Sequence, residues 1–247
     1  GMILITGPTG SGKTTTLYAT LEKINSEKQK IITVEDPVEY QLEGITQIQA
    51  NASIGLNFAA GLRSIVRQDP DVLMVGEIRD HETAEISIES ALTGHLVFST
   101  LHTNDAAGAV TRLQDMGVEG YLISSSLLAI QAQRLVRRVC TDCAELVDLN
   151  QDEATVLGVP IEICPKVKRG SGCESCAHTG YRGRVGLYEL LMMSDAIRHH
   201  IANDSDANVI RDQAVAEGMQ TLREDAIEKL KNGRTTPEEV VRVTRSA

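Results

Sequence analysis

Aromatic residues are scarce in this sequence, which has no tryptophan, two phenylalanines and five tyrosines among 247 residues. Proline is also scarce, with 6 residues, and the 20 glycines are an ordinary share, whereas 42% of the residues are hydrophobic and 23% are charged. This composition excludes a largely disordered or low-complexity chain. No apolar run reaches the roughly 20 residues of a membrane span, because the longest candidates, near residues 121–130 and 185–193, are short and contain polar side chains. The length fits one large domain or two modest ones, and we expect two.

Basic residues are outnumbered, with 24 lysines and arginines against 34 aspartates and glutamates, which gives a formal net charge of -10. Such a charge repels phosphate backbones, and the few aromatic side chains leave few platforms on which bases stack. A local basic spot is compatible with this balance, but wholesale binding of nucleic acid is not expected. The chain also begins at Gly1 directly on an apolar run, without a leader, so we expect it to be a piece of a longer protein.

Short apolar runs alternate with helical patterns in the first half of the chain. Runs typical of strands buried on both faces of a parallel sheet occupy residues 2–6, 30–34, 72–75 and 96–100. Helical patterns of crossover length lie between them at residues 14–27, 58–67 and 82–92. Asp105 is placed to cap a further helix with Ala106, Val110, Leu113 and Met116 on its apolar face, and residues 121–135 are expected to continue helical. The order of elements predicts an α/β fold with a mostly parallel sheet.

The pattern changes at residue 140, where a segment rich in cysteine, glycine and basic residues begins and runs to about residue 183. We expect an irregular inserted element there, followed by an extended segment at residues 184–193 and by three or four helices from Ser194 onward. Thr236 would cap the last helix, with Pro237 at its first position and Glu239 closing a capping box. The chain is thus divided into a core at residues 1–138, a cysteine-rich element at 139–183, and a C-terminal strand and helical module at 184–247.

A glycine-rich string follows the first predicted strand and precedes the first predicted helix. It comprises Gly7, Pro8, Thr9, Gly10, Ser11, Gly12, Lys13 and Thr14, with Thr15 next. The string fits the P-loop pattern, in which backbone N–H groups and a helix N-terminus hold the phosphates of a nucleotide. We expect Lys13 to reach the β- and γ-phosphates of ATP and the Thr14 hydroxyl to bind Mg²⁺. The alternative is a glycine-rich turn that carries a lysine by chance, and the strand before it and the helix after it argue against that.

Two acidic residues follow predicted strands at the edge of the sheet where ligands of parallel sheets bind. An ATPase needs a carboxylate there to orient water, and Glu77, which follows the strand at 72–75, is the candidate catalytic residue. Glu35, after the strand at 30–34, is a second candidate that would help to orient the metal's water shell. Gly76 stands where many P-loop proteins have an aspartate that helps to hold Mg²⁺, so metal binding would rest on Thr14, the phosphates and water. Helix capping is the alternative role for either acid.

Histidines and arginines flank the same strands. His102 follows the strand at 96–100 and is a candidate for contact with the γ-phosphate, whereas His95 precedes that strand and more often would be structural. Arg63, Arg67 and Arg79 flank the strand that leads to Glu77. Singly, each arginine fits a solvated or ion-paired surface position; together they suit the presentation of positive charge to a phosphate across a subunit boundary.

Four of the five cysteines form two Cys-x-x-Cys pairs, Cys140 with Cys143 and Cys173 with Cys176. Two such pairs are typical of a tetrahedral zinc site, and the long segment between them must form its own loop or hairpin. Disulfides or redox-active dithiols are the alternatives, and a chain that uses ATP and has no secretion signal belongs in a reducing compartment, where metal binding is favoured. We therefore predict structural Zn²⁺, with Cys164 left as an ordinary free thiol.

Four stretches of this chain, in their order, resemble the sequence boxes of the secretion ATPases, the motors of type II secretion and type IV pilus assembly. They are the P-loop, the acidic stretch at residues 32–40, the stretch at 67–80 that holds Glu77, and the stretch at 93–103 that holds His102. The four cysteines and the following residues 180–190 are similar to the subfamily that drives secretion or pilus extension, since retraction motors lack these cysteines. The wording of the boxes and the tail at 238–245 favour type II secretion over pilus extension.

The resemblance implies a RecA-like, Mg²⁺-dependent ATPase that drives pseudopilus assembly and protein export across the outer membrane. It also implies a homohexamer on the cytoplasmic face of the inner membrane, attached through the cytoplasmic domains of inner-membrane secretion or pilus platform proteins. Glu77 would be the catalytic carboxylate, Glu35 its partner in the acidic box and His102 a sensor, with the three arginines in nucleotide or inter-subunit contacts. The glycine at position 76 is also what this family shows.

The resemblance also implies an N-terminal domain before the ATPase core. We expect this chain to be the part without that domain, and therefore expect weak ATPase activity and poor hexamer formation from this chain alone. Two other functions stay open. One is a nucleic-acid translocase on the same RecA-like core, with the zinc element as its reader. The other is a structural module that binds ATP without turnover, which requires that Glu77 is not catalytic.

Overall fold

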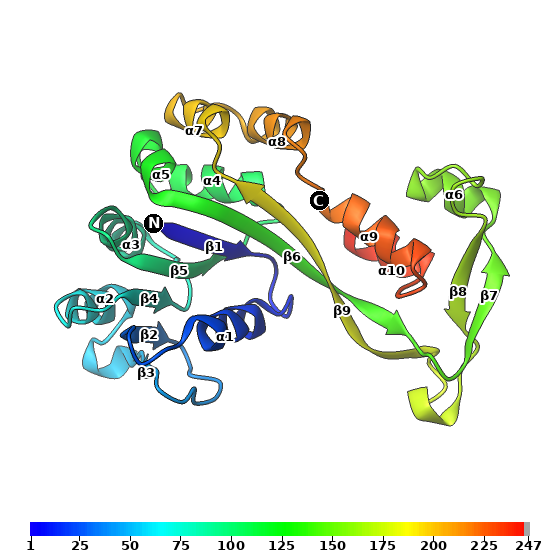
Figure 1. The fold of residues 1–247 in the computed structure, drawn as a ribbon, viewed down its shortest axis with the longest axis horizontal. Coiled ribbons are helices and arrows are strands. Elements are labelled where there is room, and N and C mark those ends of the chain that lie inside the picture. Colours follow the sequence, from blue (N-terminus) through cyan, green and yellow to red (C-terminus); the bar gives the residue numbers. More distant parts are fainter. Residues whose placement is uncertain (245–247) are drawn as a thin grey trace. The chain divides into compact units, whose positions relative to one another are not determined.

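The chain folds into two compact units in the structure, a computed structural model that describes residues 1–244 (Figure 1). The first unit comprises residues 1–132 and 190–219, and the second comprises residues 133–189 and those from 220 onward. The borders fall inside two long strands, β6 (Leu127–Val139) and β9 (Tyr181–Met192), each of which contributes residues to both units. The division at residues 138 and 183 that the sequence suggested stays a prediction.

A mostly parallel sheet of seven strands runs in the order β3-β2-β4-β5-β1-β6-β9. Its shorter strands are β1 (Met2–Thr6), β2 (Ile31–Glu35), β3 (Thr46–Gln49), β4 (Val72–Val75) and β5 (Leu96–Leu101). Parallel pairing joins β1 to β5 and β6, β4 to β2 and β5, and β2 to β3. The α/β fold and the four strands predicted in this region are confirmed. The short β3 was not predicted, because its sequence is polar and gives no apolar run.

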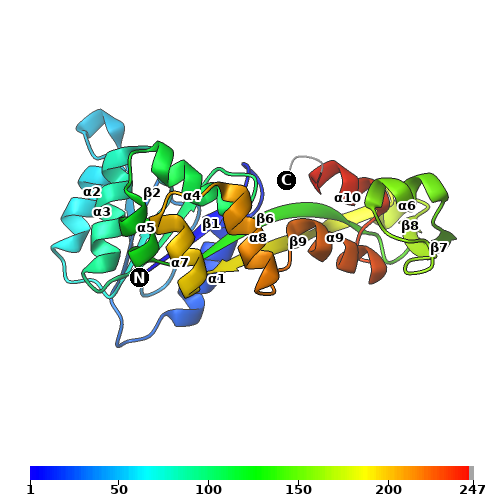
Figure 2. The same ribbon diagram turned by 90° about the horizontal axis from the view of Figure 1, so that it is seen from above.

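Several helices of the first unit begin at a residue whose side chain caps the helix N-terminus. The unit contains α1 (Lys13–Ile24), η1 (Ala52–Ile54), α2 (Phe58–Val66), α3 (His81–Leu92), α4 (Ala106–Asp115), α5 (Gly120–Ser126), α7 (Asp195–Ala202) and α8 (Ala207–Ala216). The side-chain oxygens of Asn57, Asp80 and Asp105 accept backbone N–H bonds at the starts of α2, α3 and α4. The cap predicted for Asp105 is thus confirmed. Helices α7 and α8 pack against α5 and α4, respectively (Figure 1 and Figure 2).

The two faces of the sheet are covered by different helices. Leu17, Tyr18 and Leu21 of α1 join a buried cluster with alternate strand residues such as Met74 and Phe98. Helices α2 and α3 pack on the strands from the opposite face, where α2 approaches β2 closely. Because both faces are buried, the strands are continuous apolar runs, as the sequence pattern indicated.

The helix predicted over residues 121–135 is wrong in its second half. Helix α5 ends at Ser126, and the chain continues as the 13-residue strand β6. Residues such as Leu127, Ala129 and Ala132 favour a helix in isolation, but β6 pairs in parallel with β1, in the register Leu4 to Ile130 and Thr6 to Ala132. Pairing with a strand more than 120 residues earlier, which residues 2–6 and 127–132 specify together, outweighs local propensity.

The second unit contains more regular structure than the irregular element that was predicted. Of the two alternatives predicted for this segment, a loop or a hairpin, the second is closer: strands β7 (Ala144–Asp148) and β8 (Lys166–Gly170) pair antiparallel. Helix α6 (Gln151–Leu157) lies between them in sequence, and η2 (Glu174–Cys176) follows β8. Helices α9 (Leu222–Lys231) and α10 (Pro237–Thr244) complete the unit. Four helices therefore follow Ser194 within the described residues, as predicted, and the extended segment before them is β9.

The side chain of Glu239 in α10 is buried and binds two arginines. Its side chain is 1% exposed, and its carboxylate accepts bonds from the backbone N–H and Nε of Arg137 and from the guanidinium of Arg242. The guanidinium of Arg137 also lies 4.0 Å from the centre of the Tyr181 ring. The capping box predicted for this residue stays a prediction, but the observed contacts fix α10 to β6 and β9 inside the second unit.

Candidate nucleotide site

The P-loop lies at the carboxyl edge of the sheet, between the end of β1 and the start of α1. Gly12 adopts φ 87° directly before α1, a left-handed conformation that favours glycine and turns the chain into the helix. The Lys13 amino group folds back over the loop and donates to the carbonyl oxygens of Gly7 (2.7 Å) and Pro8 (3.2 Å). The loop thus curls around the amino group of its own lysine at a helix N-terminus, which is where anions bind.

The end of β1 is tied to the end of β5. The hydroxyl of Thr6 accepts from the backbone N–H of Thr103 (2.9 Å) and lies 2.7 Å from the Thr103 hydroxyl oxygen. The backbone N–H of Gly7 donates to the carbonyl of Leu101. These contacts fix the start of the P-loop beside the segment that carries His102.

Glu77 and His102 come together at this edge. The Glu77 carboxylate, 15% exposed, lies 3.2 Å from Nε2 of His102 through Oε2 and pairs with the Arg79 guanidinium through Oε1. Burial opposes the ionisation of Glu77, but the hydrogen bond and charge of Arg79, together with His102, outweigh it, so the pKa of this carboxyl is lowered. Glu77 is therefore an anion that is accessible on one side.

Glu35 ends β2 and is almost fully buried, at 3% exposure. Its Oε1 accepts from the Thr33 hydroxyl (2.6 Å) and from the Gln47 amide (3.1 Å), and its Oε2 accepts from the Tyr18 hydroxyl. Each carboxylate oxygen therefore has a protein donor. Neither Tyr18 nor Gln47 was found from the sequence, although Tyr18 follows Thr14 by four residues and so lies on the same side of α1.

The other predicted arginines and His95 lie apart from Glu77 in this chain. Arg63 of α2 pairs with Glu82 at the start of α3. Arg67 caps the C-terminal end of α2, near the amino ends of the strands and thus at the edge opposite the P-loop. The ring of His95 contacts the carbonyl of Ser90 at 2.9 Å, which is a structural role. Contacts of Arg63 and Arg67 with a nucleotide or a neighbouring subunit stay a prediction.

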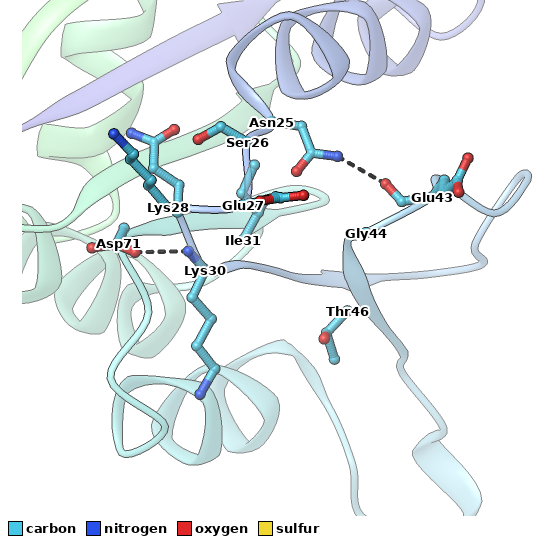
Figure 3. A pocket seen from close by; sticks show the side chains of 11 residues that line it. Asn25, Ser26, Glu27, Lys28, Lys30, Ile31, Glu43, Gly44, Thr46 and Asp71 are labelled. Carbon is cyan, nitrogen blue, oxygen red and sulfur yellow. Dashed lines mark hydrogen bonds between the residues drawn. The ribbon is translucent and has the colours of Figure 1, made fainter.

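A cavity of about 620 Å³ lies near the opposite edge of the same sheet, around the C-terminal end of α1 and the start of β2 (Figure 3). Two hydrogen bonds cross its walls, from the backbone N–H of Lys30 to Asp71 (2.7 Å) and from the Asn25 amide to the carbonyl of Glu43 (2.8 Å). Two lysines and three acidic residues line it, so it has no strongly dominant charge. Because β2 begins here and ends at Glu35, this cavity is separate from the P-loop edge.

The four paired cysteines converge in the second unit. Sγ atoms lie 3.9 Å apart for Cys140 and Cys173, 3.9 Å for Cys143 and Cys176, and 3.7 Å for Cys173 and Cys176. Four thiolates bound to one zinc at about 2.3 Å stand about 3.8 Å apart, so this spacing fits a tetrahedral zinc site. All five cysteines are free thiols, and Cys164 is buried outside the cluster.

Backbone groups support two of the sulfurs. The N–H of Gly172 donates to Sγ of Cys143, and those of Cys173 and Gly180 donate to Sγ of Cys176. The bond from Cys173, together with that from Gly180, lowers the pKa of Cys176 to about 6, although burial opposes this. Gly180 (φ 77°) also touches Gly170 so closely that a Cβ on Gly170 would lie 2.1 Å from the Gly180 carbonyl oxygen.

The family model described as Type II/IV secretion system protein matches residues 1–242. The chain therefore belongs to this family. Type II secretion system protein E of Aeromonas hydrophila is 53% identical over 245 residues, covering 99% of this chain and 49% of the relative. The type IV pilus assembly ATPase PilB of Myxococcus xanthus is 49% identical over 248 residues, covering 98% of this chain and 43% of PilB.

Solved structures of the family share the fold. The pilus retraction motor PilT, solved with bound ADP, superposes with a TM-score of 0.72 at 32% identity, covering 99% of this chain and 61% of PilT. The ATPase DotB of Legionella pneumophila gives 0.72 at 26% identity, covering 100% of this chain and 60% of DotB. The chain spans about half the length of the curated relatives it matches. Within residues 1–244, no helix combines the length and apolar character needed to cross a membrane.

The predicted membership of the secretion ATPases is confirmed, and so are the mostly parallel core, the clustering of four cysteines and the C-terminal helices. The structure brings Glu77, Arg79 and His102 together and leaves Arg63 and Arg67 elsewhere. Which of these residues act on a nucleotide stays a prediction.

Proposed function

We propose that this chain is the ATP-hydrolysing part of a type II secretion motor. The observation that carries the proposal is the ionised Glu77 beside His102. These residues follow the adjacent strands β4 and β5, and β5 pairs with β1, the strand that leads into the P-loop. Support for type II secretion comes from the relatives of that name, among them the Aeromonas hydrophila protein at 53% and the Vibrio cholerae type II secretion system ATPase E at 49% identity.

The P-loop would bind the ATP phosphates through the backbone N–H groups of Gly7 to Thr15 and the amino group of Lys13. Glu77 would orient the attacking water as an ionised carboxylate, and His102, on its other oxygen, would sense the γ-phosphate. Arg79 holds Glu77 in this structure and is the arginine nearest to the proposed chemistry. Arg63, on α2, and Arg67, at the C-cap of that helix, are proposed to act across a subunit boundary.

Magnesium would be held by the Thr14 hydroxyl, near the start of α1 directly after the loop, together with phosphate oxygens and water. Oxygen donors of this kind suit Mg²⁺, and the ion supplies charge neutralisation on the transferred phosphoryl group. Glu35 would act on the water shell of this ion. Zinc would be held by Cys140, Cys143, Cys173 and Cys176, whose sulfur spacing suits a tetrahedral site. Four cysteine ligands leave no coordination position open for water or substrate, which is typical of a structural site.

The assembly and its place in the cell are also proposals. We infer a homohexamer of the full-length protein, working at the cytoplasmic face of the inner membrane with the cytoplasmic domains of platform proteins. The support is family membership together with relatives named for secretion and pilus assembly. The net charge of -10 argues against nucleic acid as the partner.

Type IV pilus assembly is the second candidate function, because PilB of Myxococcus xanthus is 49% identical over nearly the whole chain. Complementation separates the two. A full-length protein that contains this chain is expected to restore export in a strain lacking its type II secretion ATPase and to leave a pilus-assembly mutant without pili. The reverse result would favour pilus assembly.

The test of the catalytic proposal is ATP turnover by the wild type and by Glu77→Gln, at several protein concentrations, with bound zinc counted on the same sample. Activity that rises with concentration and disappears in the variant supports an assembled motor with Glu77 at its centre. Unchanged turnover in Glu77→Gln would instead place the reaction elsewhere.

A further inference from the structure

The residue that connects the P-loop helix to the acidic box is Tyr18. It lies on α1, five residues after Lys13, and its side chain is fully buried in the cluster between α1 and the sheet. Its hydroxyl donates to Oε2 of Glu35. A hydrogen bond therefore joins the helix that follows the proposed phosphate site to the acid at the end of β2, a strand separated from β1 by two others.

The same hydroxyl also fixes the segment after β2. It accepts from the backbone N–H of Glu39 (3.3 Å) and from the Gln47 amide (3.3 Å), and the rings of Tyr18 and Tyr40 stack edge to face with centres 4.7 Å apart. Tyr18 thus connects α1, on which it lies, to β2, β3 and the loop between these strands. A buried tyrosine hydroxyl usually finds a hydrogen-bond partner, but that of Tyr18 has three, from three different segments.

Gln47 of β3 binds the carboxylate oxygen of Glu35 that Tyr18 does not bind. Its amide nitrogen donates to Oε1 of Glu35 (3.1 Å), and its Oε1 accepts from the backbone N–H of Leu42 (2.7 Å). With the Thr33 hydroxyl, the Glu35 carboxylate has three side-chain donors that approach from three different strands or helices. Such a set leaves a buried carboxylate one orientation.

We propose that Tyr18, assisted by Gln47, is a positioning residue of the ATPase site: its hydroxyl holds the Glu35 carboxylate relative to α1, so that Mg²⁺-dependent nucleotide binding depends on a group that contacts neither metal nor nucleotide. The inference rests on the proposed function in one respect, that Glu35 acts on the metal's water shell. Burial and the bond to Glu35 both raise the pKa of Tyr18, so the hydroxyl stays protonated and remains a donor at working pH.

The experiment is a Mg²⁺ titration of the binding of a fluorescent, non-hydrolysable ATP analogue, with binding in EDTA measured alongside. The variants are Tyr18→Phe, Glu35→Gln and their combination. Tyr40→Phe is the matched control. It also removes one tyrosine hydroxyl, but from a residue that is 51% exposed, and it keeps the ring that contacts Tyr18. Circular dichroism and thermal melting report whether each variant is folded.

We expect Tyr18→Phe to raise the Mg²⁺ concentration at half-binding about tenfold, the size expected for loss of a hydrogen bond to a charged group. Binding in EDTA and the behaviour of Tyr40→Phe should match the wild type. Tyr18→Phe should add nothing in the Glu35→Gln background, because it acts through that carboxylate. If Tyr18→Phe does not fold, Gln47→Met should shift the same midpoint in the same direction.

Two results overturn the proposal. One is an equal loss of binding with and without Mg²⁺, which marks Tyr18 as a core residue only. The other is a Mg²⁺ dependence that neither Tyr18→Phe nor Glu35→Gln changes. The readout is binding, so a wild type that binds the analogue but never hydrolyses ATP would contradict the proposed function while the midpoints still decide the role of Tyr18.

Discussion

Oε2 of Glu77 lies 3.2 Å from Nε2 of His102, although 24 residues separate these side chains from each other in sequence. The contact follows from strand register, since β4 and β5 pair Val75 with Ser99 and end side by side. Beyond the strands, the Ile78 N–H donates to the Thr100 carbonyl (3.0 Å), which keeps the two segments together. Glu77 is thus held by the fold, with Arg79 as its second partner.

We expect Arg79 to determine where ATP turnover falls off at low pH. Burial raises the pKa of Glu77, whereas Arg79 and His102 together lower it overall, so removal of the guanidinium should bring the pKa back up. In Arg79→Ala, the low-pH limb of kcat/KM is therefore expected to move to higher pH, because Glu77 is protonated sooner as pH falls. The measurement is a pH series of ATP turnover for both proteins.

Arg211→Ala is the matched control for that series. Arg211 lies on α8, where its guanidinium is next to Asp212 and its side chain is 37% exposed. Its profile should coincide with that of the wild type. A shift of the limb in the Arg79 variant toward lower pH, or no shift, would contradict the assigned effect of Arg79 on Glu77.

Zinc content should depend on the four clustered cysteines and not on the fifth. Cys143→Ser removes one ligand of the tetrahedral set, so bound zinc is expected to fall from about one per chain to near zero, with loss of stability in the second unit. Cys164→Ser is the matched control, because this buried thiol lies outside the cluster, and it should keep its zinc. Elemental analysis of the purified proteins measures both. Full zinc in Cys143→Ser would mean that the metal binds elsewhere.

Glu239 should stabilise the second unit in a pH-dependent way. Burial raises the pKa of this carboxyl, but Arg242 and Arg137 outweigh burial and lower it overall. Glu239→Gln removes the anion that these half-exposed arginines bind and should reduce the free energy of unfolding by about 2 kcal/mol, the size expected for hydrogen bonds to a charged group. The neighbouring Glu238→Gln breaks only a half-exposed pair with Arg169 and should cost about 1 kcal/mol or less.

The sign of the pH effect at Glu239 follows from its lowered pKa. The stabilisation is fully present above the unfolded pKa of glutamate, about 4.3, and is lost as pH falls through the lower pKa of the folded state. The difference between wild type and Glu239→Gln in urea unfolding should therefore be constant from neutral pH to about 5 and shrink below about 4. A difference that grows with acid would contradict the assignment.

Local patterns predicted the parts of this protein whose partners are close in sequence. Each of three motifs consists of residues close together in the sequence: the P-loop, the cap at Asp105 and the two cysteine pairs. All three were identified from the sequence. Strand β6 was missed because its pairing partner is β1, far along the chain. The contact between Tyr18 and Glu35 was missed for the same reason, since a tyrosine on the apolar face of α1 looks like any other core residue until β2 is placed against it.

The most direct test of the central claim is nucleotide binding and ATP turnover measured together for the wild type and for Glu77→Gln, across a range of protein concentrations. The account predicts that both proteins bind ATP alike through the P-loop, that wild-type turnover rises with concentration, and that the variant loses nearly all turnover, by a factor of about 100 or more. Equal turnover by Glu77→Gln would contradict it, because the carboxylate held between Arg79 and His102 would then take no part in hydrolysis.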